Sequence, residues 1–287
     1  MTTTDARVRA ATDTSVEPAA PARERVGVRQ RLRPARHLLP VLPVLGAVLA
    51  WHLVTEMDLV AWLRFDKLPG PLDVAASLRR QLESGVFYEH MVASLRRILS
   101  GFAIAAVLGV AVGMAIGRSR VAAALLRPLL EVARPIPAIA LVPIAILLFP
   151  TSEQGIVFIT CFAAFFPVTV STIHAMRALP QVWTDAARTL GANRWQVLAH
   201  VVLPGAMPAI FSGLSVGMGV AWICVISAEM ISGQFGVGYW TWMSYSLLDY
   251  AGVVTGMLTI GALGYGTAWV IERVGRRVNH WLPGEAR

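Results

Sequence analysis

The chain has 287 residues, of which 56% are hydrophobic and only 15% charged, and its formal net charge is +8. About a quarter of the residues in a soluble domain are charged. This composition therefore excludes an ordinary soluble domain and indicates an all-α integral membrane protein. The positive charge requires no nucleic-acid partner, since the arginine excess of cytoplasmic loops accounts for it.

The N-terminal segment differs from the rest of the chain. Residues 1–36 mix Thr, Ala, Pro, Glu and Arg with little apolar periodicity, so we expect a disordered basic cytoplasmic tail near anionic lipid. Residues 37–55 are apolar and lack the cleavage site of a secretory signal, which predicts a retained first span. Residues 37–91 would then comprise this span and an external amphipathic segment.

Four later stretches contain no Asp, Glu, Lys or Arg, and each has the about 20 apolar residues that a transmembrane helix needs. They are residues 98–117, 155–176, 205–228 and 251–271. Small residues recur every four positions in two of them, as Gly101, Ala105, Gly109, Gly113 and Gly117, and as Ala209, Gly213, Gly217 and Ala221. Such stripes predict faces on which helices approach closely.

Residues 121–149 are apolar but interrupted by Arg127, Glu131, Arg134 and four prolines. Two interpretations stay open. The stretch is either one broken span that lines a pathway, or a cytoplasmic amphipathic helix up to Arg134 followed by a short span from Ile136. The first interpretation makes about six transmembrane helices in total.

The arginines predict the orientation of these spans. In an alternating six-span order, the basic groups of the tail and of three later loops fall on one side, and they include Arg118, Arg120, Arg188, Arg194, Arg276 and Arg277. Both termini, including the tail at 277–287, and the polar loop at 180–204 are therefore expected to be cytoplasmic.

The polar loop at 180–204 has the pattern of a helix, a turn and a second helix. Trp183, Ala187 and Leu190 share one face of a helix, and Gly191 tolerates the positive φ of a sharp turn. Trp195, Leu198 and Val202 continue as a second apolar stripe, and Pro204 can open the following span. A surface hairpin without a partner and a DNA-binding helix-turn-helix share this pattern.

Candidate pathway residues stand within or beside the spans. Glu229 follows 24 uncharged residues and is either a pathway or gate residue or an interfacial acid in contact with water. Arg134 and Pro137 lie in the interrupted stretch, and Ser171 follows a proline inside a span. Catalytic, metal-binding and phosphate-loop patterns are missing, so we expect no enzymatic activity, no metal site and no bound cofactor.

The polar loop resembles the E-A-A-x3-G-x9-I-x-L-P loop of ABC importer permeases. Its matching residues are Asp185, Ala186, Ala187, Gly191, Leu203 and Pro204, with Asp185 in place of the usual Glu and Val201 in place of Ile. Further segments resemble the permeases of nitrate, sulfonate, taurine and bicarbonate importers, namely Leu-Pro-Gly-Pro at 68–71, Ser-Leu-Arg-Arg-Ile at 94–98, Arg-Pro-Ile-Pro-Ala at 134–138, Ala-Phe-Phe-Pro at 164–167 and Ala-Glu-Met at 228–230.

This resemblance implies a type I ABC importer permease fold, with its core at residues 92–276 and a coupling-helix loop at 180–204. It implies a bacterial inner-membrane permease that works as a homodimer with two cytoplasmic ATPase subunits, which bind the ATP and Mg, and an external substrate-binding lipoprotein. The expected cargo is a small anionic solute of the sulfonate, taurine, nitrate or bicarbonate type. The alternatives are a heterocyclic vitamin precursor as cargo, an ATPase-independent channel and a membrane enzyme.

Overall fold

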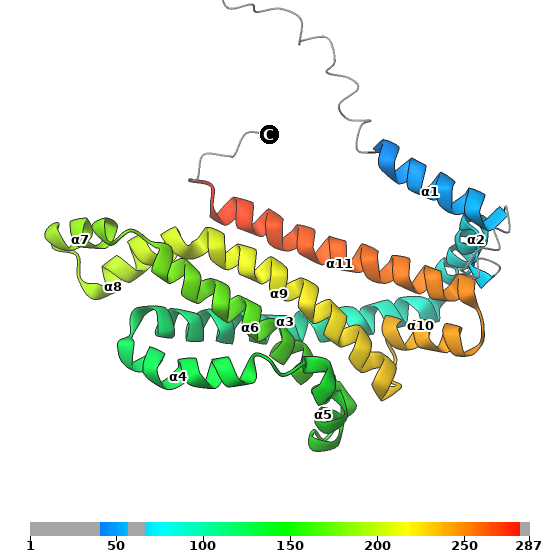
Figure 1. Ribbon diagram of the computed structural model, residues 1–287, viewed down its shortest axis with the longest axis horizontal. Helices are drawn as coiled ribbons and strands as arrows, with labels where there is room; N and C mark the ends of the chain where they lie inside the picture. Colours follow the sequence, from blue (N-terminus) through cyan, green and yellow to red (C-terminus); the bar gives the residue numbers. More distant parts are fainter. Residues whose placement is uncertain (1–40, 57–66, 282–287) are drawn as a thin grey trace, which may run out of the picture. The chain divides into compact units, whose positions relative to one another are not determined.

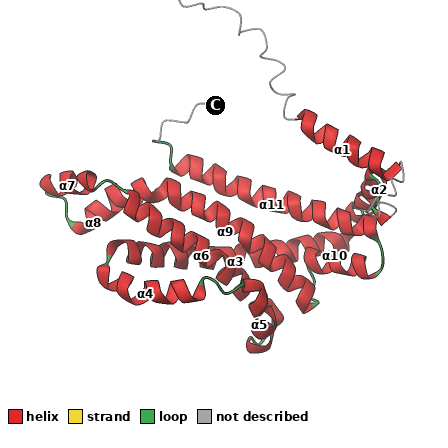
Figure 2. Cartoon of the chain, in the orientation of Figure 1, coloured by secondary structure: helices red, strands yellow, loops and turns green. Residues whose placement is uncertain are grey.

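The structure is a computed structural model that describes residues 41–56 and 67–281, and this part of the chain forms helices and no strand (Figure 2). The predicted all-α class is confirmed. The chain divides into two compact units, residues 1–50 and 51–287, with the boundary inside helix α1 (Val41–Glu56).

Helix α1 falls within the predicted first span. Its 16 residues are mostly apolar. At about 1.5 Å per residue they measure about 24 Å, less than the about 30 Å of the hydrocarbon core of a bilayer. Residues 37–40 of the predicted span lie outside the described part of the chain.

The second unit contains all the helices from α2 onward (Figure 1). In chain order they are α2 (Pro71–Leu82), α3 (Gly85–Arg118), α4 (Arg120–Ala133), the 3-10 helix η3 (Ala138–Leu141), α5 (Val142–Leu148), α6 (Ser152–Ala178), α7 (Gln181–Thr189), α8 (Arg194–Val197), the π-helix η4 (Leu198–Val202), α9 (Leu203–Ser232), α10 (Val237–Ser246) and α11 (Tyr250–Val278). The four predicted uncharged stretches lie inside α3, α6, α9 and α11, each long and apolar enough to cross a membrane, so these spans are confirmed.

The interrupted stretch forms two helical pieces rather than one straight helix. Helix α4 and the η3–α5 segment are bent by 83° at a short break after Ala133, where Pro135 has no N–H to continue the helical hydrogen bonds and Pro137 disfavours helical geometry in the residue before it. Helix α5 has seven residues, about 10 Å at about 1.5 Å per residue, and cannot cross a membrane by itself. Of the two sequence-based interpretations, the short complete span does not fit, and the bent pair forms either a broken span or a re-entrant loop.

Helix α6 packs between α3 and α9, and the small-residue stripes are the packing faces. A Cβ atom built on Gly101 would lie 2.8 Å from the Cβ of Thr160, and one built on Gly217 would lie 2.9 Å from Cγ2 of Val168. Both predicted faces therefore contact α6, within one chain. One predicted member of the α9 stripe, Ala209, is exposed, and Ala206 and Ile210 are buried instead. The side chains of α9 that face α6 recur at intervals of three or four residues, because one helical turn has 3.6 residues.

Different helices lie at the two ends of this bundle. Figure 1 shows α7 and α8 at the same end of the second unit as the α3–α4 junction and the C-terminal end of α11, with α10 at the opposite end. Those of the predicted cytoplasmic arginines that lie in the described residues, such as Arg118, Arg188 and Arg276, thus belong to segments at one end.

Candidate functional site

A knob formed by α7, its following turn, and α8 extends beyond the spans α6 and α9 (Figure 1). The predicted helix, turn and helix are confirmed. Gly191 has a φ of +84°, which an L side chain rarely adopts. Asn193 then caps α8, since the Gln196 N–H donates to Asn193 Oδ1 at 2.9 Å and the Asn193 N–H donates to Gln196 Oε1 at 2.8 Å.

A π-turn joins the knob to α9. The Leu203 N–H donates to the carbonyl of Leu198, five residues earlier, and Pro204 has no N–H with which to restore the regular pattern. This turn places Val197 and Val202 together in the interior. The predicted second stripe is wrong at Trp195, which is 79% exposed, because that prediction assumed 3.6 residues per turn throughout.

The outer surface of the knob carries large apolar side chains that are exposed in the described chain. Trp183 is 52% exposed and Leu190 is 89% exposed. Asp185 on the same helix is also exposed, and its Oδ1 lies 3.7 Å from Arg188 Nη1. Ala186 and Gly191 are also exposed, whereas Ala187, Leu203 and Pro204 are half-buried toward the base. Exposed apolar side chains of this size beside a carboxylate are typical of a protein-binding surface.

Three of the four predicted pathway residues line one groove. Arg134 and Pro137 reach it from the break between α4 and α5, and Ser171 reaches it from α6. The groove has a volume of about 470 Å³ and is otherwise mainly apolar, with Phe162 and Phe166 among its lining residues. Glu229 does not line it. The tertiary structure thus brings Arg134, Pro137 and Ser171 together, which their separation in sequence did not indicate.

The Arg134 side chain is exposed in this groove and forms no ion pair or hydrogen bond with any residue in the described ranges. The neighbouring Arg127 differs, because its Nε donates to Glu131 Oε1 at 2.8 Å on the same helix. A groove with one free guanidinium, one hydroxyl and apolar walls can orient a small anion.

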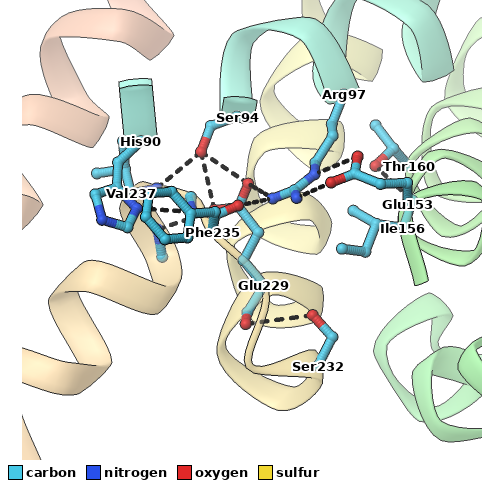
Figure 3. Close-up of polar contacts among 12 residues, drawn as sticks. His90, Ser94, Arg97, Glu153, Ile156, Thr160, Glu229, Ser232, Phe235 and Val237 are labelled. Carbon is cyan, nitrogen blue, oxygen red and sulfur yellow. Dashed lines mark hydrogen bonds and ion pairs between the residues drawn. The ribbon is translucent and has the colours of Figure 1, made fainter. Parts of the chain in front are cut away.

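Glu229 lies in a buried polar network (Figure 3), close to the C-terminal end of α9, whereas the knob joins the N-terminal end of this helix. Its carboxylate is 0% exposed and accepts from Arg97 Nη1 at 2.9 Å, from the Ser94 hydroxyl at 2.7 Å and from the Gly238 N–H at 2.9 Å. The interpretation as a water-exposed interfacial acid is therefore wrong. A carboxylate is stable at such depth only when it is paired and hydrogen-bonded, as this one is.

Arg97 joins this carboxylate to three other segments. Its Nε donates to Glu153 Oε2 of α6 at 2.9 Å, its Nη2 also contacts Glu153, and its Nη1 contacts the Phe235 carbonyl. Figure 3 shows the guanidinium between the two carboxylates. The glycine-rich segment at 233–238 is anchored here, since the Gly236 N–H donates to His90 Nδ1 at 2.9 Å. Sequence reasoning had left the role of Arg97 open.

Comparison with known proteins agrees with this architecture. A family model described as "Binding-protein-dependent transport system inner membrane component" matches residues 105–280. The chain is 32% identical over 258 residues to the bicarbonate transport system permease protein CmpB of Synechococcus elongatus, covering 85% of this chain and 89% of CmpB. It is 31% identical over 236 residues to the taurine transport system permease protein TauC of Escherichia coli, covering 80% of this chain and 85% of TauC.

The fold has a solved counterpart. A chain of the MetNI methionine ABC transporter superposes with a TM-score of 0.57 at 19% identity, covering 67% of this chain and 96% of the MetNI chain. The four long spans, the sequence relatives and the family match agree with one another. The chain therefore belongs to the binding-protein-dependent transport system inner membrane component family, and it is a multi-pass permease subunit of the ABC importer type.

Proposed function

We propose that two copies of this chain form the translocation pathway of an ATP-driven importer, which takes a small anion from an external binding protein. The unpartnered apolar surface of the α7–α8 knob carries the proposal. Trp183, Leu190 and Trp195 would be costly to expose to water unless a second protein covers them. A cytoplasmic ATPase subunit is the partner that an importer permease requires.

The knob is placed to transmit motion into the spans. It connects α6 directly to α9, and these two helices pack against each other along the bundle. A displacement of the knob by ATP-driven closure of two ATPase subunits would therefore reach both walls of the groove that contains Ser171. The groove opens alternately to the two sides of the membrane when this packing shifts between two states.

The groove supports an anionic cargo. Arg134 provides an unpaired positive charge and Ser171 a hydroxyl, both facing a space of about 470 Å³. CmpB and TauC are transport permeases for bicarbonate and taurine, which carry a carbonate and a sulfonate group. An anion of this size and chemistry is the cargo that these residues favour.

The distribution of charge supports the expected orientation. The segments that carry the loop arginines Arg118, Arg120, Arg188, Arg194, Arg276 and Arg277 lie at the end that holds the knob, whereas Arg79, Arg80, Arg96 and Arg97 belong to α2 and the first half of α3. By the positive-inside rule this end lies in the cytoplasm, together with both termini, when the chain is in the bacterial inner membrane. The opposite end, which holds α10 and the Glu229 network, faces the external binding protein.

Co-purification tests this assembly. The tagged chain is extracted from native membranes in mild detergent, and its partners are identified by mass spectrometry. We expect an ATPase subunit and an external binding protein with the wild type, and loss of the ATPase with Asp185→Arg or Trp195→Ala. Trp242→Ala is the matched control, since Trp242 is exposed on α10 at the opposite end, and it should retain the ATPase. A stable lone chain, indifferent to these changes, would support the channel alternative instead.

A further inference from the structure

A smaller pocket continues the pathway groove along α4 and α6. It shares Arg134, Phe166 and Val170 with the groove and has a volume of about 120 Å³. Its remaining lining includes His174 and Arg177 from the last turns of α6. Because α6 ends where the knob begins, this pocket lies between the groove and the knob end of the bundle.

The pocket has an excess of positive charge. It is lined by Arg127, Glu131, Arg134 and Arg177 together with His174. The Arg127–Glu131 ion pair of 2.8 Å neutralises two of these charges. In residues 41–56 and 67–281, the side chains of Arg134, His174 and Arg177 have no hydrogen bond or ion pair, so two guanidinium charges and one imidazole remain unpartnered.

The depth of Arg134 distinguishes it from an ordinary interfacial arginine. Helix α4 starts at the knob end and runs 14 residues, about 21 Å at about 1.5 Å per residue, before Arg134. Figure 1 shows this end of α4 near the middle of the long helices. A charged side chain at mid-span is costly unless it lines a wet pathway or meets an opposite charge. Arg177 is near the helix end and could reach lipid headgroups, but Arg134 could not.

The size of the pocket limits the ligand. A water molecule occupies about 30 Å³ of the liquid, so the pocket has room for roughly four. A planar or tetrahedral oxyanion with few heavy atoms fits this space. Guanidinium groups recognise such oxyanions through paired N–H donors.

We infer that Arg134, His174 and Arg177 form an inner anion-binding site, separate from the groove at Ser171, for a small carboxylate, carbonate, sulfonate or nitrate-type anion. Arg134 borders both spaces, so an anion can pass from one to the other without losing its contact with this guanidinium. The direction of travel rests on the proposed import function, whereas anion binding itself does not.

Cysteine labelling in defined vesicles tests the site without measuring transport. The chain contains two cysteines, which are replaced as Cys161→Ser and Cys224→Ala. Ile173→Cys then places a reporter in the pocket and leaves all three site residues intact. Its rates of reaction with an anionic and a cationic methanethiosulfonate are compared in phosphatidylcholine vesicles. The control reporter is Ser246→Cys on α10, where the nearby loop has no basic residue.

Relative to the control, we expect the pocket reporter to prefer the anionic reagent about tenfold or more, because two nearby cations attract one reagent and repel the other. Arg134→Gln with Arg177→Gln should abolish this preference. Added bicarbonate, nitrate or taurine should slow both reactions at the pocket and neither at Ser246→Cys. If the double variant does not purify, Arg177→Gln alone should lower the preference, because Arg177 is exposed and its loss leaves no buried group unpaired.

Two results would overturn the site. One is an equal preference at both reporters. The other is protection only in vesicles that contain phosphatidylglycerol and no added anion, which would assign the pocket to a lipid headgroup. Co-purification of the ATPase is measured on the same preparations, so a failed anion site with a retained ATPase leaves the importer proposal intact.

Discussion

Arg97 on α3 and Glu229 on α9 form a fully buried ion pair, with 2.9 Å between Nη1 and Oε1, although 132 residues separate them in the sequence. Glu153 on α6 binds the same guanidinium. Arg97 therefore links α3, α6 and α9 through hydrogen bonds, at the end of the bundle opposite the knob. This network holds that end together, so a push on the knob can be transmitted along the helices to the groove.

Removal of Arg97 should destabilise the protein strongly. Arg97→Met leaves Glu229 buried without its counter-ion, which costs about 3–5 kcal/mol. Unfolding in mixed detergent micelles measures the loss. The matched control is Arg96→Met, one residue earlier and exposed, which should change stability by less than about 0.5 kcal/mol. Addition of Glu229→Gln to Arg97→Met should recover part of the loss, since the unpaired charge is then gone. Equal effects of the two single variants would contradict a stabilising pair.

Close helix packing at Gly113 gives a second prediction. A Cβ atom there would lie 2.5 Å from the Cβ of Thr172 and 2.9 Å from the Thr169 carbonyl on α6. Gly113→Ala should therefore destabilise the bundle by about 1–3 kcal/mol. Gly219→Ala is the control, because no atom lies within 4 Å of its Cβ position, and it should be neutral or slightly stabilising. Thermal unfolding of both variants in one detergent distinguishes them, and equal melting temperatures would refute the close approach.

The turn at Gly191 gives a third prediction, about coupling rather than stability. Proline cannot adopt the φ of +84° found at this position, so Gly191→Pro should misplace α7 relative to α8 while the spans stay inserted. Transport-linked ATP hydrolysis in the reconstituted importer should fall about tenfold or more. Typical coupling free energies of about 1–3 kcal/mol correspond to changes of about 5- to 150-fold. Gly191→Asn is the control, since asparagine tolerates positive φ and should retain most activity. Normal coupling in the proline variant would rule out a rigid turn.

The π-turn between the knob and α9 gives a fourth prediction. A single π-turn adds one residue to an α-helix, so deletion of Ala199 should restore regular geometry and keep Val197 and Val202 on one face. We expect stability to change by less than about 1 kcal/mol. Deletion of the exposed Val216 from regular α9 is the control, and it should cost more than about 3 kcal/mol because later side chains leave their faces. Similar losses in both deletions would argue against a π-turn.

The sequence alone determined the features that depend on neighbouring residues. The uncharged length of each long span, the turn at Gly191 and the start of α9 at Pro204 could all be predicted, because hydrophobic periodicity, positive φ and the missing proline N–H act locally. The helix, turn and helix at 180–204 could be predicted for the same reason, since these residues are contiguous.

Only the tertiary structure decided which distant groups meet. Glu229 became a buried partner of Arg97 rather than a solvated acid, and Arg134 joined Ser171 beside a common groove. The stripe on α9 shifted from Ala209 to Ala206 and Ile210, because the partner helix and the π-turn set its register. These outcomes depend on how helices pack across the bundle, and one sequence carries no direct record of pairs of residues separated by tens of positions.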